Sequence, residues 1–284
     1  MEQNYTPKDY KSALKSIWCP GCGDFGVLSA VYQALARLQL DPWDVSIISG
    51  IGCSSRLPGY VTTYGFNAIH GRVIPIATGV KLANPDIVVL GVGGDGDGLS
   101  IGGGHFPHVA RRNVDITYII MDNQVYGLTK GQVSPTTEVG ELSKTTIYGN
   151  IDPPLKPVSL ALAYRVSFVA RGFSSYHKHL AELIANGIQH KGFAFIHALS
   201  PCPTFRGKEQ FEIIKEKSDF LPEDYDYTDK QAAYRIAEDR ERLWLGLIYK
   251  KERPTYMDRL KGLKDRAKKT GTYRIREMID HFVP

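Results

Sequence analysis

The sequence has 284 residues, of which 43% are hydrophobic and 23% are charged. These proportions are ordinary for a globular protein and exclude collagen-like, low-complexity and wholly disordered chains. The 35 basic and 30 acidic residues leave a net charge of +5, which does not by itself indicate a nucleic-acid partner. No stretch approaches the roughly 20 apolar residues of a membrane span, and the first residues lack the apolar core of a signal peptide. We therefore expect a cytoplasmic protein with no membrane and no nucleic-acid partner.

Four apolar, β-branched runs predict strands that are buried on both faces. They span residues 45–51, 86–92, 115–121 and 193–199. Segments with helical spacing lie between or beside them, at 26–39, 100–112, 159–172 and 178–190. Asp24 is a candidate N-cap for the first of these helices, and Pro107 is expected to interrupt the second. This alternation predicts an α/β fold with a largely parallel sheet and helices on both faces.

The composition changes towards the end of the chain. Residues 134–157 show no sustained period and many turn formers, which predicts a long irregular loop. From about Gly207 charged residues become frequent. We expect residues 1–208 to form the domain that carries the chemistry, and residues 209–284 to form a charged, mainly helical extension of two or three helices.

Polar, glycine-rich segments follow all four predicted strands. They span residues 52–60, 93–104, 122–132 and 200–208. Ligands of an open parallel sheet bind outside the carboxyl ends of the strands. We therefore expect these four segments to share one edge of the sheet and to form the functional site.

The second of these segments overlaps GVGGDG (91–96), which matches a dinucleotide-binding pattern. Asp95 and Asp97 argue against that interpretation, because their carboxylates would face a pyrophosphate. Acids beside a diphosphate are favourable when Mg²⁺ lies between them, and Asn123 and the carbonyl of Val125 could complete its oxygen shell. A magnesium–diphosphate site is thus the main interpretation. An NAD-dependent dehydrogenase, or a tight turn with helix-capping aspartates, remains the alternative.

The four cysteines form a second set of candidate ligands. Cys19 and Cys22 make a C-x2-C pair ahead of the first helix, while Cys53 and Cys202 lie in two of the loops after strands. Four thiolates can hold a 4Fe-4S cluster, whereas structural zinc sites usually show two close pairs. A redox C-x2-C with two inert thiols, or a non-catalytic subunit stabilised by zinc, stays open. The neighbouring Asp95 site favours the cluster.

Five segments together resemble the β subunit of the 2-oxoacid:ferredoxin oxidoreductases. They are CPGCGD (19–24), GIGCSSR (50–56), HGR with IPIATGVKLANP (70–85), GDGDGLSIGGGHFPHVARRN (94–113) and MDNQVYGLTKGQ (121–132). The resemblance is collinear over roughly residues 17 to 210 and is highly specific, because it does not rest on one short motif. It implies a thiamine diphosphate-binding fold for this part of the chain.

The resemblance also implies the cofactors and their contacts. It implies thiamine diphosphate, Mg²⁺ and one 4Fe-4S cluster. The metal ligands that match the family motifs are Asp95, Asn123 and the Val125 carbonyl, and the cluster ligands are Cys19, Cys22, Cys53 and Cys202. The other positions that match cofactor contacts are Ile51, Gly52, Cys53, Ser54, His70, Gly96, Asp97, Gly127 and Leu128. Without the resemblance, His70 would be read as a core histidine.

The implied reaction is the reversible oxidative decarboxylation of a 2-oxoacid to its acyl-CoA, with electrons passing to ferredoxin and CO2 fixation as one direction of flux. Arg56 and Leu128 are candidate substrate contacts. A guanidinium binds a carboxylate bidentately, so Arg56 favours 2-oxoglutarate, with succinyl-CoA as product, over pyruvate and acetyl-CoA. The implied partners are CoA, ferredoxin and a larger α subunit that supplies a pyrimidine-binding domain, in a dimer of αβ pairs.

Overall fold

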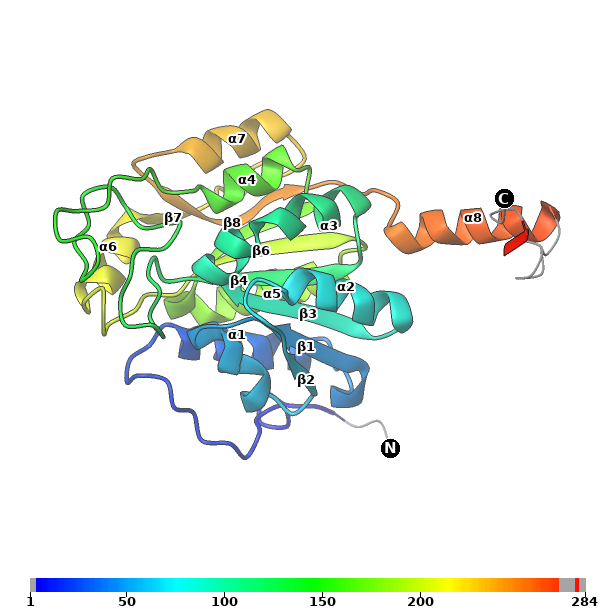
Figure 1. Ribbon diagram of the computed structural model, residues 1–284, viewed down its shortest axis with the longest axis horizontal. Coiled ribbons are helices and arrows are strands. Elements are labelled where there is room, and N and C mark those ends of the chain that lie inside the picture. The colour runs from blue at the N-terminus through cyan, green and yellow to red at the C-terminus, as the bar shows by residue number, and fades with distance from the viewer. Residues whose placement is uncertain (1–3, 271–278, 281–284) are drawn as a thin grey trace.

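A computed structural model describes residues 4–270 and 279–280. Within this part of the chain, the strands form one sheet in the order β2-β1-β3-β4-β6-β5-β8-β7 (Figure 1). Their bounds are β1 (Val45–Ser49), β2 (Tyr64–Asn67), β3 (Val88–Gly94), β4 (Ile116–Asp122), β5 (Phe168–Phe173), β6 (Phe193–Leu199), β7 (Ser218–Phe220) and β8 (Leu243–Lys250). All neighbouring pairs are parallel except β5 with β8. The sheet is therefore largely parallel, as predicted.

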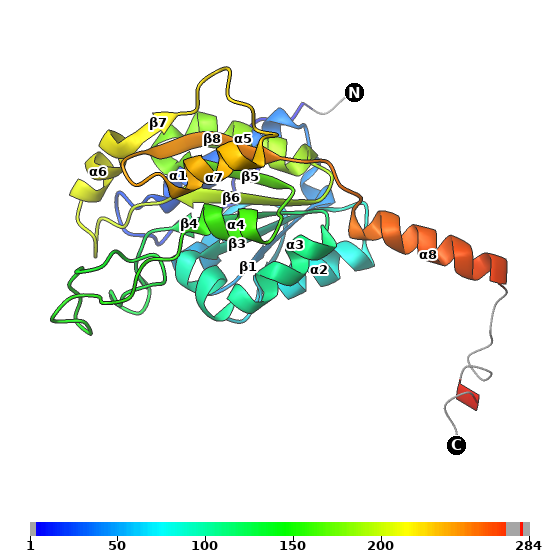
Figure 2. The same ribbon diagram turned by 90° about the horizontal axis from the view of Figure 1, so that it is seen from above.

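Helices cover both faces of the sheet (Figure 2). On one face, α1 (Asp24–Arg37) and α5 (His177–Gln189) enclose an apolar core with β1, β3, β4, β5 and β6. The helices on the opposite face are α2 (Val73–Ala83), α3 (Phe106–Arg112), α4 (Pro157–Ala163) and α7 (Lys230–Glu238). Every residue of β4, β5 and β6 is buried, because these central strands are covered on both sides.

Several predicted elements are confirmed. The four apolar runs correspond to β1, β3, β4 and β6, and the segments 26–39 and 178–190 correspond to α1 and α5. Residues 134–156 form neither helix nor strand, as expected for the long loop. The alternation of strands and helices thus carried enough information to predict the centre of the sheet.

The helix predicted over 159–172 is wrong in its second half. The helix α4 ends at Ala163, and Arg165 adopts a left-handed conformation with φ of 60°, which terminates the helix. The chain then enters the buried strand β5, which pairs with both β6 and β8. The packing of Phe168 and Val169 between two layers of helices outweighs the local helical spacing.

Two expected helix boundaries also differ from the structure. Pro107 does not interrupt a helix; it lies in the first turn of α3, where a missing N–H costs nothing. A π-helical turn, η3 (Gly96–Ile101), and a short 3-10 turn precede it. Asp24 is not an N-cap but the first residue of α1, and its carboxylate accepts a 2.6 Å hydrogen bond from Ser200 Oγ.

The C-terminal part contains the expected helices and two strands that the sequence analysis missed. The helices are α6 (Glu209–Lys217), α7 and α8 (Tyr256–Thr270), and α8 projects away from the sheet (Figures 1 and 2). β7 and β8 extend the central sheet. The division at residue 208 stays a prediction. No helix in the described ranges is both long and apolar enough to cross a membrane.

Candidate functional site

A cavity of about 430 Å³ lies where β1, β3 and β4 end. Every residue predicted to bind the diphosphate cofactor or Mg²⁺ lines it: Ile51, Gly52, Cys53, Ser54, His70, Asp95, Gly96, Asp97, Asn123, Val125, Gly127 and Leu128. The remaining lining residues are Asp24, Gly94, Met121, Tyr126, Thr129, Gln132 and Val133. Its volume is in the range of small-molecule sites. The structure therefore brings the loops after β1, β2, β3 and β4 to one edge.

The carboxylate of Asp97 holds two of these loops together. Its Oδ1 accepts hydrogen bonds from the backbone N–H groups of Ile51 (2.9 Å) and Gly71 (2.8 Å), and His70 Nδ1 lies 3.0 Å from the same oxygen. A Cβ at Gly50 would lie 1.9 Å from Asp97 Oδ2, so only glycine fits beside this carboxylate. The Asp97 side chain is thus fixed by protein contacts at the cavity.

Asp95 takes part in a buried polar network that reaches away from the cavity. Thr136 Oγ1 lies 2.8 Å from both Asp95 Oδ2 and Asp122 Oδ1, and Asp122 Oδ2 lies 2.8 Å from His197 Nε2. Arg171 Nε then contacts His197 Nδ1 at 3.3 Å. Burial, and then the nearby Asp122, raise the pKa of Asp95. A divalent cation would favour its ionised form.

The residues after β4 provide oxygen donors beside Asp95. Asn123 Oδ1 accepts a 3.0 Å hydrogen bond from the backbone N–H of Val125, which folds this segment into a tight turn. The buried hydroxyl of Ser54, on the opposite loop, has no hydrogen-bond partner among the described residues. One carboxylate, one amide and a carbonyl fit the hard-oxygen preference of Mg²⁺, and an unpaired hydroxyl could meet a diphosphate.

The four cysteines gather next to this cavity as free thiols. Cys53 Sγ and Cys202 Sγ lie 3.5 and 4.0 Å from the point that a Cβ would occupy at Gly127, so both sulfurs lie beside this glycine of the cavity wall. Electrostatic interactions connect Cys22 with Cys53 and Cys202, and Cys19 with the same two thiols. The C-x2-C turn packs directly on the Cys202 loop, because Gly23 N–H donates to Pro201 O at 3.0 Å.

Burial favours the neutral form of three of these thiols, Cys22, Cys53 and Cys202. Within the described ranges, no three or more His, Cys, Asp or Glu side chains converge on one metal-sized point. Burial raises the pKa of Cys53 to about 11, and burial together with Asp24 raises the pKa of Cys22. Burial also raises the pKa of Cys202, although hydrogen bonds from the backbone N–H groups of Phe205 and Thr204 oppose this rise. Bound iron would stabilise all of these groups as thiolates. Four such thiols could hold a 4Fe-4S cluster.

The two candidate substrate contacts differ in their position. Leu128 lines the cavity and is partly exposed at 43%. Arg56 lies in the 3-10 turn η2 (Cys53–Tyr60), half-buried, and does not line the cavity. Its positive charge opposes the effect of burial on the pKa of Cys53, so the guanidinium lies near the cavity wall.

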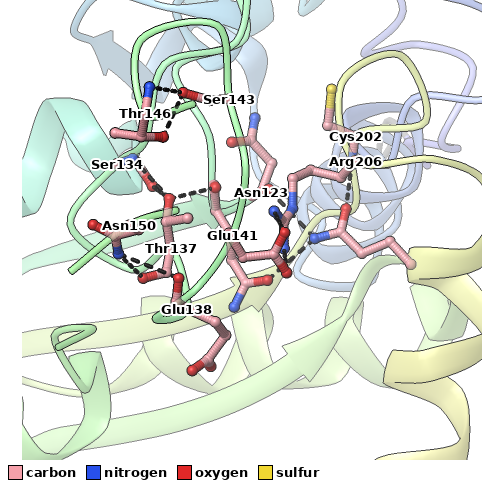
Figure 3. Close-up of polar contacts among 12 residues, drawn as sticks. Asn123, Ser134, Thr137, Glu138, Glu141, Ser143, Thr146, Asn150, Cys202 and Arg206 are labelled. Carbon is pink, nitrogen blue, oxygen red and sulfur yellow. Dashed lines mark hydrogen bonds and ion pairs between the residues drawn. The ribbon is translucent and has the colours of Figure 1, made fainter. Parts of the chain in front are cut away.

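The long loop is held against the cysteine loop by polar contacts (Figure 3). Arg206 forms two contacts with the Glu141 carboxylate, Nη1 to Oε2 at 2.7 Å and Nη2 to Oε1 at 2.8 Å. Within the loop, Asn150 Nδ2 donates to the carbonyls of Thr137 (3.0 Å) and Glu138 (3.2 Å). The loop therefore has a defined conformation although it contains no helix or strand.

Sequence reasoning missed several residues of the site. Asp122 had a signal, because it is a second acid at the end of the strand that precedes Asn123. Asp24 was noticed only as a helix cap, yet it lines the cavity. Thr136 and Gln210 reach the site from the long loop and from α6, and no local pattern marks them.

Comparison with known proteins decides the family. The model of the C-terminal thiamine pyrophosphate-binding domain of thiamine pyrophosphate enzymes matches residues 50–198, and that of the C-terminal region of the pyruvate ferredoxin oxidoreductase beta subunit matches residues 202–265. The chain is 40% identical over 265 residues to 2-oxoacid:ferredoxin oxidoreductase 2, subunit beta, of Aeropyrum pernix, with 89% of this chain and 86% of that protein covered. This chain belongs to the beta subunits of the 2-oxoacid:ferredoxin oxidoreductases. The resemblance noted in the sequence is thereby confirmed.

Other members of the 2-oxoacid:ferredoxin oxidoreductase family are similar over almost the whole chain. The 2-oxoglutarate synthase subunit KorB of Methanocaldococcus jannaschii is 39% identical over 258 residues, with 90% of this chain and 95% of that protein covered. A solved structure of 2-oxoglutarate:ferredoxin oxidoreductase from Magnetococcus marinus, with 2-oxoglutarate, coenzyme A and succinyl-CoA bound, is 43% identical. It superposes with a TM-score of 0.94 and covers 99% of this chain and 97% of that chain.

Proposed function

We propose that this chain is the beta subunit of an enzyme that converts 2-oxoglutarate, CoA and oxidised ferredoxin reversibly into succinyl-CoA, CO2 and reduced ferredoxin. One observation carries the proposal: the fold agrees at a TM-score of 0.94 and 43% identity with an oxidoreductase solved with 2-oxoglutarate, coenzyme A and succinyl-CoA. The KorB relatives, which are named for 2-oxoglutarate, support the same substrate.

The cavity supports thiamine diphosphate with Mg²⁺ as its cofactor. Asp95, Asn123 and the Val125 carbonyl would hold the metal, and Ser54 offers a hydroxyl to the diphosphate. Because Asp97 Oδ1 already accepts from the N–H groups of two loops, we expect the cofactor contact of Asp97 to come from its backbone or from Oδ2, which is buried without a hydrogen-bond partner among the described residues. When bound, thiamine supplies the electron sink for decarboxylation and the cluster accepts electrons one at a time.

The protein groups contribute positioning and a fixed electrostatic environment. Asp97 joins the Ile51 and Gly71 loops, so the cavity keeps its shape before any ligand arrives. Cys19, Cys22, Cys53 and Cys202 would place the cluster beside Gly127, directly next to the cofactor cavity. This arrangement gives electrons a short path from the cavity to the cluster.

An anaerobic visible spectrum with iron and sulfide analysis tests the cofactor assignment. We expect the purified complex to be brown, to bleach on reduction and to contain one 4Fe-4S cluster per beta subunit. It should also contain thiamine diphosphate and Mg²⁺, and EDTA should weaken the binding of both. A colourless protein with bound zinc would instead support a non-catalytic subunit. Bound NAD without a metal requirement would support the dehydrogenase alternative.

Steady-state kinetics test the substrate. The rate of viologen reduction is measured with 2-oxoglutarate and with pyruvate under saturating CoA. We expect kcat/KM to be higher for 2-oxoglutarate, and a wild-type preference for pyruvate would contradict the proposed substrate while leaving the cofactor assignment intact.

A further inference from the structure

The side chain of Gln210 joins two loops of the candidate site. Gln210 is the second residue of α6 and is only 5% exposed. Its Oε1 accepts a 2.9 Å hydrogen bond from the backbone N–H of Cys202. Its Nε2 donates to Gln124 Oε1 at 3.2 Å and to the carbonyl of Asn123 at 3.5 Å. One amide thus connects a predicted cluster ligand with the turn that carries a predicted magnesium ligand.

The partners of Gln210 determine how its amide is oriented. A backbone N–H can only donate and a backbone carbonyl can only accept, so Oε1 must face Cys202 and Nε2 must face Asn123. Glutamine is the uncharged side chain of this length that offers an acceptor and a donor at once. A buried amide with partners on both sides is a specific connection, since a merely space-filling position would favour an apolar side chain.

The connection lies where the sheet can no longer hold the two loops. β4 and β6 are paired up to Asp122 and Leu199, and Ser200 N–H still donates to Asp122 O at 2.7 Å. Beyond this point the segments that follow β4 and β6 continue into the Asn123 turn and the Cys202 turn. Among the hydrogen bonds of the described residues, those of Gln210 link these two turns across the end of the ladder.

The Cys202 turn is also held from other directions. Arg206 N–H donates to Cys202 O at 2.9 Å, which closes the turn, and the Arg206 guanidinium pairs with Glu141 on the long loop (Figure 3). These contacts fix the shape of the turn and its outer side. Among the hydrogen bonds of the described residues, those of Gln210 relate Cys202 to the metal side of the cavity.

We propose that Gln210 is a positioning residue that holds the Cys202 corner of the cluster at a fixed separation from the metal-bound diphosphate. The inference rests on the proposed function, because it assumes that Cys202 binds the cluster and that the Asn123 turn binds the metal. Electron transfer slows steeply with distance, so loss of the connection slows the reduction of the cluster by substrate without removing either cofactor.

The test uses the assembled complex with three substitutions in this chain. Gln210→Met keeps the buried volume and removes all three hydrogen bonds. Gln210→Glu keeps an acceptor for Cys202 N–H but cannot donate to the Asn123 carbonyl, so it breaks the connection on the metal side alone. Glu216→Ala, at an exposed position of the same helix, is the matched control.

In Gln210→Met we expect iron and thiamine diphosphate contents of the wild type, an altered EPR spectrum of the reduced cluster and a roughly tenfold slower reduction by 2-oxoglutarate in stopped flow. Reduction by dithionite, which does not pass through the cavity, should be unchanged. Gln210→Glu should also reduce the cluster more slowly than the wild type, because it lacks the donor to the Asn123 carbonyl. A wild-type substrate-driven rate in either variant would overturn the proposal.

A measurement that needs no cofactor separates this proposal from the proposed function. Hydrogen exchange of the apo complex should show that the amide of Cys202 exchanges roughly tenfold faster in Gln210→Met than in the wild type, and at the wild-type rate in Glu216→Ala. Equal exchange in all variants would overturn the connection itself. A wild-type complex that contains no iron would overturn the proposed function. The exchange rate of the Cys202 amide would still decide whether Gln210 holds the Cys202 turn.

Discussion

We predict that the choice of substrate depends on Arg56. Its guanidinium is half-buried, and no ion pair with an acid is formed within the described residues. A free guanidinium beside the cavity can bind the distal carboxylate of a dicarboxylic 2-oxoacid bidentately, whereas pyruvate offers only a methyl group there. We predict that Arg56→Ala lowers kcat/KM for 2-oxoglutarate about 30- to 150-fold, the effect of losing roughly 2 to 3 kcal/mol, and leaves that for pyruvate nearly unchanged.

A second arginine provides the control for this experiment. Arg37 is exposed on α1 and pairs with Glu182 on α5, away from the cavity. Arg37→Ala removes the same charge and should leave both values of kcat/KM unchanged. Equal losses on both substrates in Arg56→Ala would assign Arg56 a general role instead of a role in substrate selection.

Asp97 allows a prediction about cofactor binding. Asp97→Ala leaves the N–H groups of Ile51 and Gly71 without their acceptor, and each unsatisfied group costs about 1 to 3 kcal/mol. We expect the Kd for thiamine diphosphate with Mg²⁺, measured by titration calorimetry, to rise at least about tenfold because the two loops are no longer joined.

Two substitutions make the Asp97 result interpretable. Asp97→Asn retains an oxygen that can accept both N–H groups and should bind the cofactor more tightly than Asp97→Ala. Asp86→Ala changes an exposed acid in the segment before β3 and should behave as the wild type. Cofactor affinity in Asp97→Ala equal to that of the wild type would show that the loops keep their shape without this carboxylate.

The predicted site residues share one property: they directly follow a strand or belong to a motif. Asp95 and Asn123 could be brought together because the carboxyl ends of parallel strands meet at one edge. Thr136 contacts Asp95 from 41 positions away, and Gln210 contacts Asn123 from 87 positions away. Such contacts depend on how an irregular loop and a peripheral helix return to the sheet, which neither spacing nor periodicity encodes.

At the scale of elements, the predictability of a strand depends on its burial. β1, β3, β4 and β6 are predominantly buried runs of apolar residues and were predicted from the sequence. All four residues of β2 are exposed, and β7 has only three residues, so neither shows a strand pattern. β8 is antiparallel to β5 and contains Gly246, so its pairing depends on a partner distant in the sequence.

The junction of α5 with β5 and β6 predicts a pH dependence of stability. His190 directly follows α5 and is 4% exposed, and its Nε2 lies 2.8 Å from Ser167 Oγ. Burial, and then Lys250, lower its pKa to about 4, so the folded protein holds it neutral. Between pH 6.5 and 4 the unfolded chain binds a proton that the folded chain does not. We therefore expect this histidine to reduce the free energy of unfolding by roughly 2 kcal/mol from pH 7.5 to pH 5.

Urea denaturation at several pH values tests this expectation. In His190→Gln, which keeps a hydrogen-bond donor but does not titrate in this range, the loss of stability between pH 7.5 and 5 should be smaller than in the wild type. His177→Gln, at the other end of α5, serves as the comparison. An identical pH profile for wild type and His190→Gln would contradict the role given to His190.

At the scale of the whole molecule, the apolar surface indicates where a partner binds. The long loop exposes several large apolar side chains, namely Val139, Leu142, Ile147, Tyr148 and Ile151, and Tyr148 is 95% exposed. The contacts of Asn150 and the Arg206–Glu141 pair hold this loop in one conformation, so these side chains are presented without a further ordering cost. Exposed apolar groups on an ordered segment are typical of protein interfaces.

We predict that this chain is inactive alone and requires a larger subunit that supplies a pyrimidine-binding domain, as the family resemblance implies. The relatives are named as subunits, which already places them in multi-subunit enzymes. Tyr148→Asp, which adds a charge to the exposed loop, should weaken assembly at least about tenfold, because a buried unpaired charge costs several kcal/mol. Co-purification with the larger subunit measures assembly, and viologen reduction with and without that subunit measures activity. Lys144→Ala, in the same loop, is the control. Full turnover by the isolated chain would contradict the requirement for a partner, and normal assembly of Tyr148→Asp would place the interface elsewhere on the surface.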